Sequence, residues 1–210
     1  MKKNYEMDMC SGPILGKLLT FTIPLIFSGI LQLLFNAADV IVVGRFAGSQ
    51  SLAAVGSTTA LINLMINIFI GLSVGVNVIV ARYYGAKREK DVQDTIHTAM
   101  ALSIVSGLFL IIVGQLLSRP MLELMGTPDD VIDKSTIYMR IIFIGMPANM
   151  IYNFGSAILR AVGDTKRPLY FLTAAGVINV VLNLFFVIMF RMDVAGVALA
   201  TAISQAISAF

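Results

Sequence analysis

One acidic residue, Asp39, lies inside a long apolar segment at residues 14–44, where residues 18–38 carry no formal charge. A carboxylate at this depth in a bilayer costs roughly 2.5–3.5 kcal/mol on insertion scales, so such residues usually face the protein interior or a watery cavity. The chemistry that suits this position is the reversible binding of a proton or a cation. The alternative is a structural carboxylate held by hydrogen bonds near the outer membrane interface.

Amide side chains on the same segment could share that proton or ion. Gln32 and Asn36 precede Asp39 by seven and three positions, which places all three on one face of a helix. We expect them to line the same cavity as the acid. Alternatively, they join neighbouring helices by hydrogen bonds, which contribute ~0.6 kcal/mol apiece.

Two further amide pairs occur at helical spacing in later apolar segments. Asn179 and Asn183 are four residues apart, and so are Asn149 and Asn153. If both pairs are aimed at Asp39, they form one polar pocket inside a helical bundle. Association of helices through amide hydrogen bonds is the alternative interpretation.

Pro24 lies in the same segment as Asp39, where it removes one backbone hydrogen bond and can kink a helix. A hinge role is our hypothesis for this residue. The sequence contains no HExxH, GxSxG or P-loop motif and no cluster of Cys or His. It therefore predicts that the protein is not an enzyme and has no metal site and no cofactor.

The elements that would position these residues are membrane-spanning helices. The chain has 210 residues, of which 58% are hydrophobic and 13% are charged, with a mean hydropathy of +0.87. Soluble proteins carry about 25% charged residues. The charges also cluster, and they leave six neutral runs near or above the ~17–25 residues of a spanning helix: 18–38, 46–81, 95–118, 141–159, 168–190 and 194–210.

We predict an all-α polytopic membrane protein, with a cytoplasmic N-terminal segment at residues 1–13 and a six-helix domain at residues 14–210. The helices are predicted at about residues 14–44, 51–84, 92–117, 131–162, 169–190 and 194–210, the last truncated. In the second helix, Gly71 and Gly75 have the spacing of small residues that suits close helix contact.

Basic residues in the short loops predict the orientation, because cytoplasmic loops carry an excess of Lys and Arg. One side of the membrane collects Lys2, Lys3, Lys17, Arg82, Lys87, Arg88, Lys90, Arg160, Lys166 and Arg167. The other side holds only Arg45, Arg119, Lys134 and Arg191. This asymmetry predicts a cytoplasmic N-terminus in the inner (cytoplasmic) membrane and places Asp39 in the outer half of its helix.

Other classes of protein fit the sequence less well. The net charge of +3 is spread over short loops and forms no single basic stripe of the kind that binds nucleic acid. Cys10 is the only cysteine, so no disulfide can form within the chain. The first apolar run is longer than that of a cleavable signal peptide and contains proline, which predicts an uncleaved first span.

Four stretches of the chain share a pattern with a known family. They are Asn36-Ala-Ala-Asp39-Val-Ile-Val-Val-Gly44-Arg-Phe-Ala-Gly48, Leu52-Ala-Ala-Val-Gly56, Arg160-Ala-Val-Gly163-Asp-Thr-Lys-Arg-Pro168 and Gly196-Val-Ala-Leu-Ala-Thr201. In combination they resemble bacterial members of the multidrug and toxic compound extrusion (MATE) family, over nearly the whole chain.

This resemblance implies both a fold and a mechanism. Family members have twelve helices in two six-helix lobes, so the chain is similar to an N-terminal lobe. The implied activity is secondary antiport, in which H⁺ or Na⁺ enters from outside while cationic, amphiphilic drugs leave. The resemblance also assigns ion coupling to Asp39, Gln32, Asn179 and Asn183, and bending of the first helix to Pro24.

The chain departs from the family pattern at two positions. Asn183 stands where the family has an acid, and Phe35 stands where a tyrosine is frequent. A site with one carboxylate binds a monovalent cation less strongly, which favours protons over sodium.

The resemblance also implies partners, namely small organic cations, the lipid bilayer and a second six-helix lobe, with no nucleic acid. Two alternatives stay open. One is a flippase for lipid-linked saccharides, which would need basic residues in its cavity, whereas only Arg140 is embedded in a predicted span. The other is a membrane subunit that does not transport.

Overall fold

The computed structural model describes residues 14–209, and the predicted N-terminal segment and Phe210 lie outside this range. The described residues form seven α-helices and two short π-helical turns, η1 and η2. In chain order these are α1 (Ile14–Val42), η1 (Val43–Ala47), α2 (Ser49–Gly85), α3 (Glu89–Leu124), α4 (Asp129–Ile144), α5 (Met146–Ala161), α6 (Lys166–Leu184), η2 (Phe185–Met189) and α7 (Asp193–Ala209).

The helices have the length and composition of a polytopic membrane protein. Four described segments are long and apolar enough to cross a bilayer, each π-helical turn extending the helix before it: Ile14–Ala47, Ser49–Gly85, Glu89–Leu124 and Lys166–Met189. The pair α4 and α5 makes a fifth span if the two are counted together, and α7 is a shorter apolar helix. The predicted all-α fold class is thereby confirmed.

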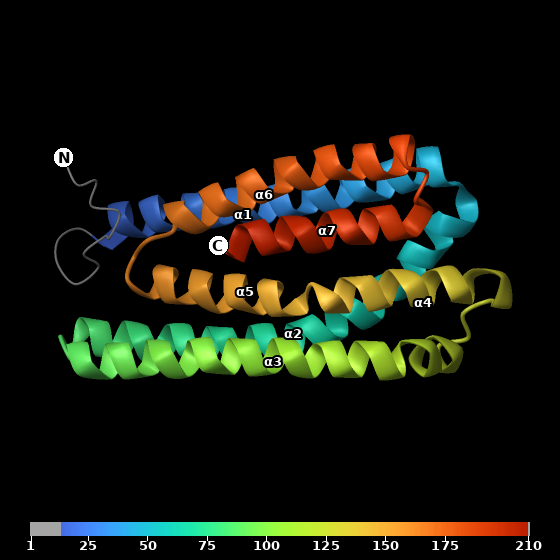
Figure 1. The fold of residues 1–210 in the computed structure, drawn as a ribbon. Coiled ribbons are helices and arrows are strands. Elements are labelled where there is room, and N and C mark those ends of the chain that lie inside the picture. The colour runs from blue at the N-terminus through green and yellow to red at the C-terminus, as the bar shows by residue number, and fades with distance from the viewer. Residues whose placement is uncertain (1–13, 210) are drawn as a thin grey trace.

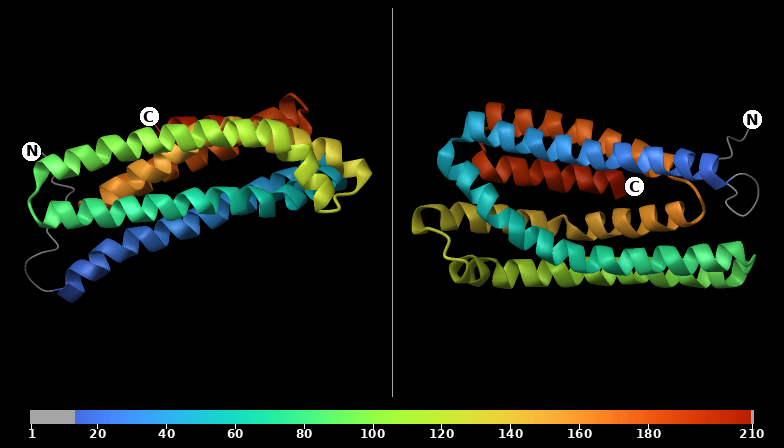
Figure 2. Two further views of the ribbon diagram at one scale, coloured as in Figure 1. Left: turned by 90° about the horizontal axis from the view of Figure 1, so that it is seen from below. Right: turned by 180° about the vertical axis from the view of Figure 1, so that it is seen from behind.

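The bundle consists of two groups of helices that α7 joins (Figure 1). In one group, α1 packs against α6, and α6 packs against α7. In the other group, α2 and α3 pack against each other and against α4 and α5, and both α4 and α5 contact α7. Figure 2 shows the same elongated bundle from two further sides.

Apart from the break between α4 and α5, the connections between helices lie at the two ends of the bundle (Figure 1). The α2–α3 and α5–α6 turns lie at the same end as the start of α1 (Figure 1), and we call this end, which carries Lys17, Arg82 and Lys166, the basic end. The α1–α2, α3–α4 and α6–α7 connections lie at the opposite end, which we call the Asp193 end. The loops therefore alternate between the two ends of the bundle, as expected for a chain that passes along it six times.

The helix predicted at residues 131–162 is not continuous, and this prediction is wrong. The chain bends by 49° between α4 and α5, at Gly145. Pro147 has no backbone N–H to donate and its ring conflicts with a continuous helix. Around the break, the Gly145 amide donates to the Ile142 carbonyl at 3.0 Å, and α5 restarts with Pro147 in its first turn, where no donor is needed.

The bend is packed tightly from the side of α3. A Cβ atom at Gly107 would lie 2.4 Å from Cα of Pro147, and one at Gly114 would lie 2.1 Å from Cγ of Phe143. Both distances are too short for any side chain, so glycine is required for α3 to approach the bend. By contrast, Gly71 and Gly75 of α2 have no atom within 4 Å of such a Cβ, so the close contact predicted there is not formed.

The helix predicted at residues 92–117 is longer in the structure, at both ends. The observed α3 extends to Leu124 and contains Pro120. Leu122 in this extension is fully buried, and Arg119 pairs with Glu123 at 3.0 Å along the helix and with Asp133 of α4 at 2.9 Å. Burial of one face and ion pairing of the other therefore outweigh the missing hydrogen bond of the proline.

The turn before α6 caps that helix. Gly163 adopts φ of 86°, which favours glycine, and Oδ1 of the buried Asp164 accepts hydrogen bonds from the amides of Lys166 and Arg167, each at 3.1 Å. These bonds satisfy amides that have no partner inside the helix. The helix therefore starts at Lys166, before the predicted residue 169.

Candidate functional site

The structure brings Asp39 of α1 into direct contact with Asn183 of α6. The side-chain amide of Asn183 donates a hydrogen bond to Oδ1 of Asp39. Asn183 is fully buried and Asp39 is half-buried. Most of α1 is exposed, and only Pro24 and Val42 of this helix are fully buried. The one acid within the first span is thus turned toward the protein and held by a neutral donor.

The two helices can approach because α6 has a glycine at the contact. A Cβ atom at Gly176 would lie 1.9 Å from the ring of Phe35 on α1. The aromatic ring therefore rests directly on the backbone of α6. This contact fixes α1 against α6 one helical turn before Asp39.

A chain of hydrogen bonds extends from the acid through α6 to α7. The amide nitrogen of Asn183 also donates to Oδ1 of Asn179 at 3.2 Å, and Asn179 donates to Oγ1 of Thr201 at 3.2 Å. Thr201 in turn donates to the carbonyl of Val197 at 3.0 Å. The predicted grouping of Asp39 with Asn179 and Asn183 is therefore present as a connected network, and the sequence analysis missed Thr201.

One acceptor in this network has no partner. Oδ1 of Asn183 is buried, and no described residue donates a hydrogen bond to it. An unpaired buried acceptor lowers the stability of the fold, because it has lost its hydrogen bond to water and gained none in the protein. Its presence is explained if another state of the site supplies a donor.

Gln32 and Asn36 lie on α1 but are exposed, whereas Asp39 is half-buried. Among the described residues, no hydrogen bond joins either amide to the acid. Their proposed part in the site remains a prediction, and they lie on the surface of this chain.

Asn149 and Asn153 do not join the network around Asp39. The amide of Asn153 donates to the carbonyl and to Oδ1 of Asn149, each at 2.9 Å. Both residues are half-buried on α5, and these bonds stay within that helix. The structure therefore aims only one of the two amide pairs at the acid.

Pro24 is buried, and α1 continues through it as one helix. The hydroxyl of Ser28 donates to the Pro24 carbonyl at 2.9 Å. The hinge role assigned to Pro24 remains a prediction, because the structure presents a single conformation of α1.

The fold and this site define a polytopic α-helical membrane protein with an ionisable residue that an asparagine amide holds against its bundle. Comparison with known proteins gives the family. The MatE family model matches residues 24–185, and the chain belongs to this family. The resemblance seen in the sequence is thereby confirmed.

Curated relatives support the same assignment. The chain is 35% identical to "Probable multidrug resistance protein YoeA" of Bacillus subtilis (strain 168) over 88% of this chain and 41% of that protein. It is 31% identical to "Probable multidrug resistance protein YpnP" of the same organism, over 96% of this chain and 45% of that protein. A third relative, 28% identical over 93% of this chain and 44% of that protein, is an "FAD transporter" of Shewanella oneidensis. The chain thus spans less than half the length of these relatives.

Solved structures show the same half-length match. A crystal structure of a MATE protein in the bent conformation superposes with a TM-score of 0.86 at 27% identity, covering 91% of this chain and 43% of that one. The straight conformation gives a TM-score of 0.85, with 27% identity and coverage of 91% and 42%. The described helices therefore form one lobe of the MATE fold.

Proposed function

We propose that this chain is the N-terminal lobe of a proton-coupled antiporter that exports cationic, amphiphilic compounds across the cytoplasmic membrane. The observation that carries the proposal is the Asp39–Asn183 pair, a carboxyl group within a spanning helix whose hydrogen-bond partner is an uncharged amide. Relatives named as probable multidrug resistance proteins and as a multidrug export protein support export as the activity.

The neutral partner favours a site that can lose its charge. A carboxylate bound to Lys or Arg would stay ionised, because an opposite charge favours the charged form. Asp39 has no ion pair among the described residues. Protonation would thus leave the site neutral and still hydrogen-bonded.

The amide of Asn183 suits both states of the acid. In the structure its nitrogen donates to the carboxylate, and its oxygen is buried without a donor. After rotation of the amide by half a turn, the oxygen would accept a hydrogen bond from a protonated Asp39. An aspartate at position 183 would instead place a second carboxylate beside the first, which suits a metal cation better than a proton.

Transport would follow from a shift between two conformations of the lobe. A proton drives the change only if it binds one conformation more tightly than the other. We propose that protonated Asp39 favours a conformation in which α1 bends at Pro24, so that bound substrate loses both space and counter-charge. The small contact area of α1, whose other face is exposed, is compatible with such movement.

The basic end of the bundle would face the cytoplasm. Lysines and arginines of the α2–α3 and α5–α6 turns gather there with the start of α1, which supports the orientation given by the positive-inside rule. The exposed apolar face of α1 would contact lipid and the second lobe.

The test is efflux of ethidium, a fluorescent cation, from proteoliposomes that contain the full-length protein, driven by an imposed pH gradient with and without sodium. We expect Asp39→Asn to reduce the initial rate at least tenfold. The matched control is Asp94→Asn, which changes an exposed acid of α3 at the basic end and should leave the rate unchanged. Wild-type efflux by the Asp39→Asn protein would refute the proposal, and efflux that needs a sodium gradient would refute proton coupling.

A further inference from the structure

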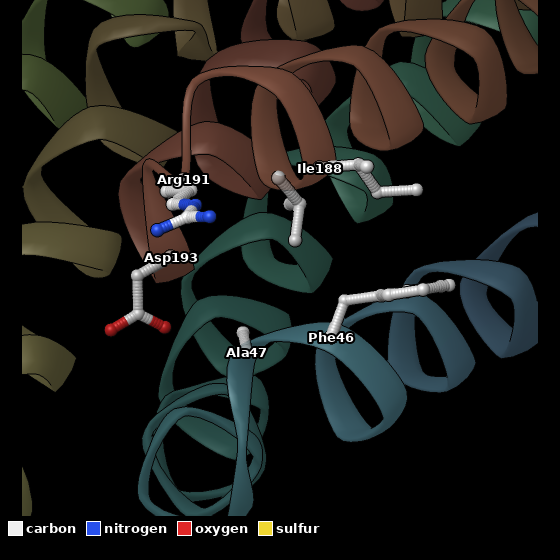
Figure 3. A pocket seen from close by; sticks show the side chains of 6 residues that line it. Phe46, Ala47, Ile188, Arg191 and Asp193 are labelled. Carbon is white, nitrogen blue, oxygen red and sulfur yellow. The ribbon is translucent and has the colours of Figure 1, made fainter.

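A hollow lies between the two π-helical turns at the Asp193 end of the bundle, away from the Asp39 site. It has a volume of about 390 Å³ and is lined by Phe46, Ala47, Val187, Ile188, Arg191 and Asp193 (Figure 3). This volume falls within the ~300–1,000 Å³ typical of small-molecule sites.

One side of the hollow is apolar. Phe46 comes from η1 and Ile188 comes from η2, and Figure 3 shows both side chains on the side away from Arg191 and Asp193. These two apolar side chains are 51% and 47% exposed. They stand at the ends of two spans, so hydrocarbon chains of the bilayer can reach them.

The other side carries one uncompensated positive charge. Asp193 is already neutralised, because Nζ of Lys134 lies 2.7 Å from its Oδ2 and the hydroxyl of Ser51 donates to its Oδ1. Arg191 is exposed, and no hydrogen bond or ion pair links it to another described residue. The net charge that the hollow presents to a ligand is therefore positive.

The backbone holds Arg191 in place at an energetic cost. Arg191 and Asp193 adopt φ of 51° and 53°, in the left-handed region that side chains other than glycine rarely enter. Strain of this kind persists where the surroundings fix it and is concentrated at ligand-binding positions. Here the Lys134 and Ser51 contacts to Asp193 fix the turn and thereby the position of Arg191.

We infer that this hollow binds a phosphate-bearing amphiphile, an anionic phospholipid of the leaflet at the Asp193 end. The headgroup phosphate pairs with Arg191, whose guanidinium group matches phosphate geometry. One acyl chain runs along Phe46 and Ile188. The hollow lies at the ends of the spans, at the depth where headgroups meet the hydrocarbon region.

A lipid in this hollow would connect the two helices of the ionisable site. The turn η1 begins four residues after Asp39, and η2 begins two residues after Asn183. Occupancy would brace the ends of α1 and α6 against each other. The inference does not depend on the transport proposal, and its test measures binding alone.

The test uses the full-length protein in nanodiscs of phosphatidylcholine with added phosphatidylglycerol, and counts the phosphatidylglycerol retained by native mass spectrometry. We expect Arg191→Gln to lower its retention about fivefold, the effect of one basic residue at an anionic surface. Arg191→Lys should retain more than Arg191→Gln, and Phe46→Ala should also weaken retention. The matched control, Arg119→Gln, removes an arginine of the same end that is paired with Glu123 and Asp133 and should change nothing.

Two results would overturn the inference. One is equal retention by the Arg191→Gln and Arg119→Gln proteins. The other is displacement of phosphatidylglycerol by soluble glycerol 1-phosphate at similar concentrations, because the site would then bind a free phosphate and the acyl chain would contribute nothing. Absence of such competition, together with a loss specific to Arg191→Gln and Phe46→Ala, supports a lipid site.

Discussion

Two amide pairs with the same spacing have different fates in this lobe. Asn179 and Asn183 of α6 are buried and connect α1, α6 and α7 through Asp39 and Thr201. Asn149 and Asn153 of α5 are half-buried and bond to each other and to their own backbone. The same four-residue spacing thus gives a hydrogen-bond network between three helices in α6, and hydrogen bonds within one helix in α5.

The difference comes from what the neighbouring helices present. Gly176 lets Phe35 and the rest of α1 approach α6, so an acid comes within reach of Asn183. Among the described residues, no acid forms a hydrogen bond with Asn149 or Asn153 of α5. Two asparagines four residues apart on a helix therefore form an ionisable site only where a packed neighbouring helix brings an acidic side chain to them.

The largest effect that this comparison predicts is that of Asn183→Leu. The change removes the donor to Asp39 and leaves Oδ1 of Asn179 without its donor inside the bundle. We expect the free energy of unfolding to fall by roughly 3 kcal/mol, the upper range for a hydrogen bond to a charged group. The measurement is reversible unfolding in mixed detergent micelles at neutral pH, and a loss no larger than that of Asn153→Leu would remove the distinction between the pairs.

The next effect tests the packing contact that creates the site. Gly176→Ala places a Cβ atom 1.9 Å from the Phe35 ring, so either the ring or α1 itself must move away from α6. We expect a loss of about 2 kcal/mol in the free energy of unfolding, typical of overpacking. The control is Gly71→Ala, where no atom lies within 4 Å of the new Cβ. Equal stability of the two variants would show that the Phe35 contact does not determine the approach of α1.

The smallest effect is expected for Asn153→Leu. Its bonds are local to α5, so the change should cost only about 0.6 kcal/mol, the average for a polar contact between residues in a membrane. The same variant should keep pH-driven ethidium efflux in proteoliposomes within a factor of two of wild type. Loss of efflux comparable to that of Asn183→Leu would place the α5 pair in the functional site.

Much of this arrangement could be predicted from the sequence because the membrane imposes it. Neutral runs longer than a spanning helix predict the helices, and the isolated charge of Asp39 predicts a residue turned toward the protein. Spacing of four residues correctly predicted that Asn179 and Asn183 share a face, since that follows from helix geometry alone.

Other features depend on contacts that no local pattern contains. The break at Gly145 needed both Pro147 and the close approach of α3, and the extension of α3 past Pro120 needed burial of Leu122. Thr201 belongs to the site only because α7 packs beside α6. The sequence alone does not tell which of the two asparagine pairs contacts Asp39, because this depends on which helices pack beside each pair.

The most direct test of the central claim is infrared difference spectroscopy of the full-length protein between acidic and alkaline buffer. Our account predicts a carbonyl band of a protonated carboxyl group that is absent from the Asp39→Asn protein. The band should shift in Asn183→Leu and stay unchanged in Asn153→Leu. A band that survives in Asp39→Asn unaltered, or one that responds equally to both asparagine changes, would contradict the account.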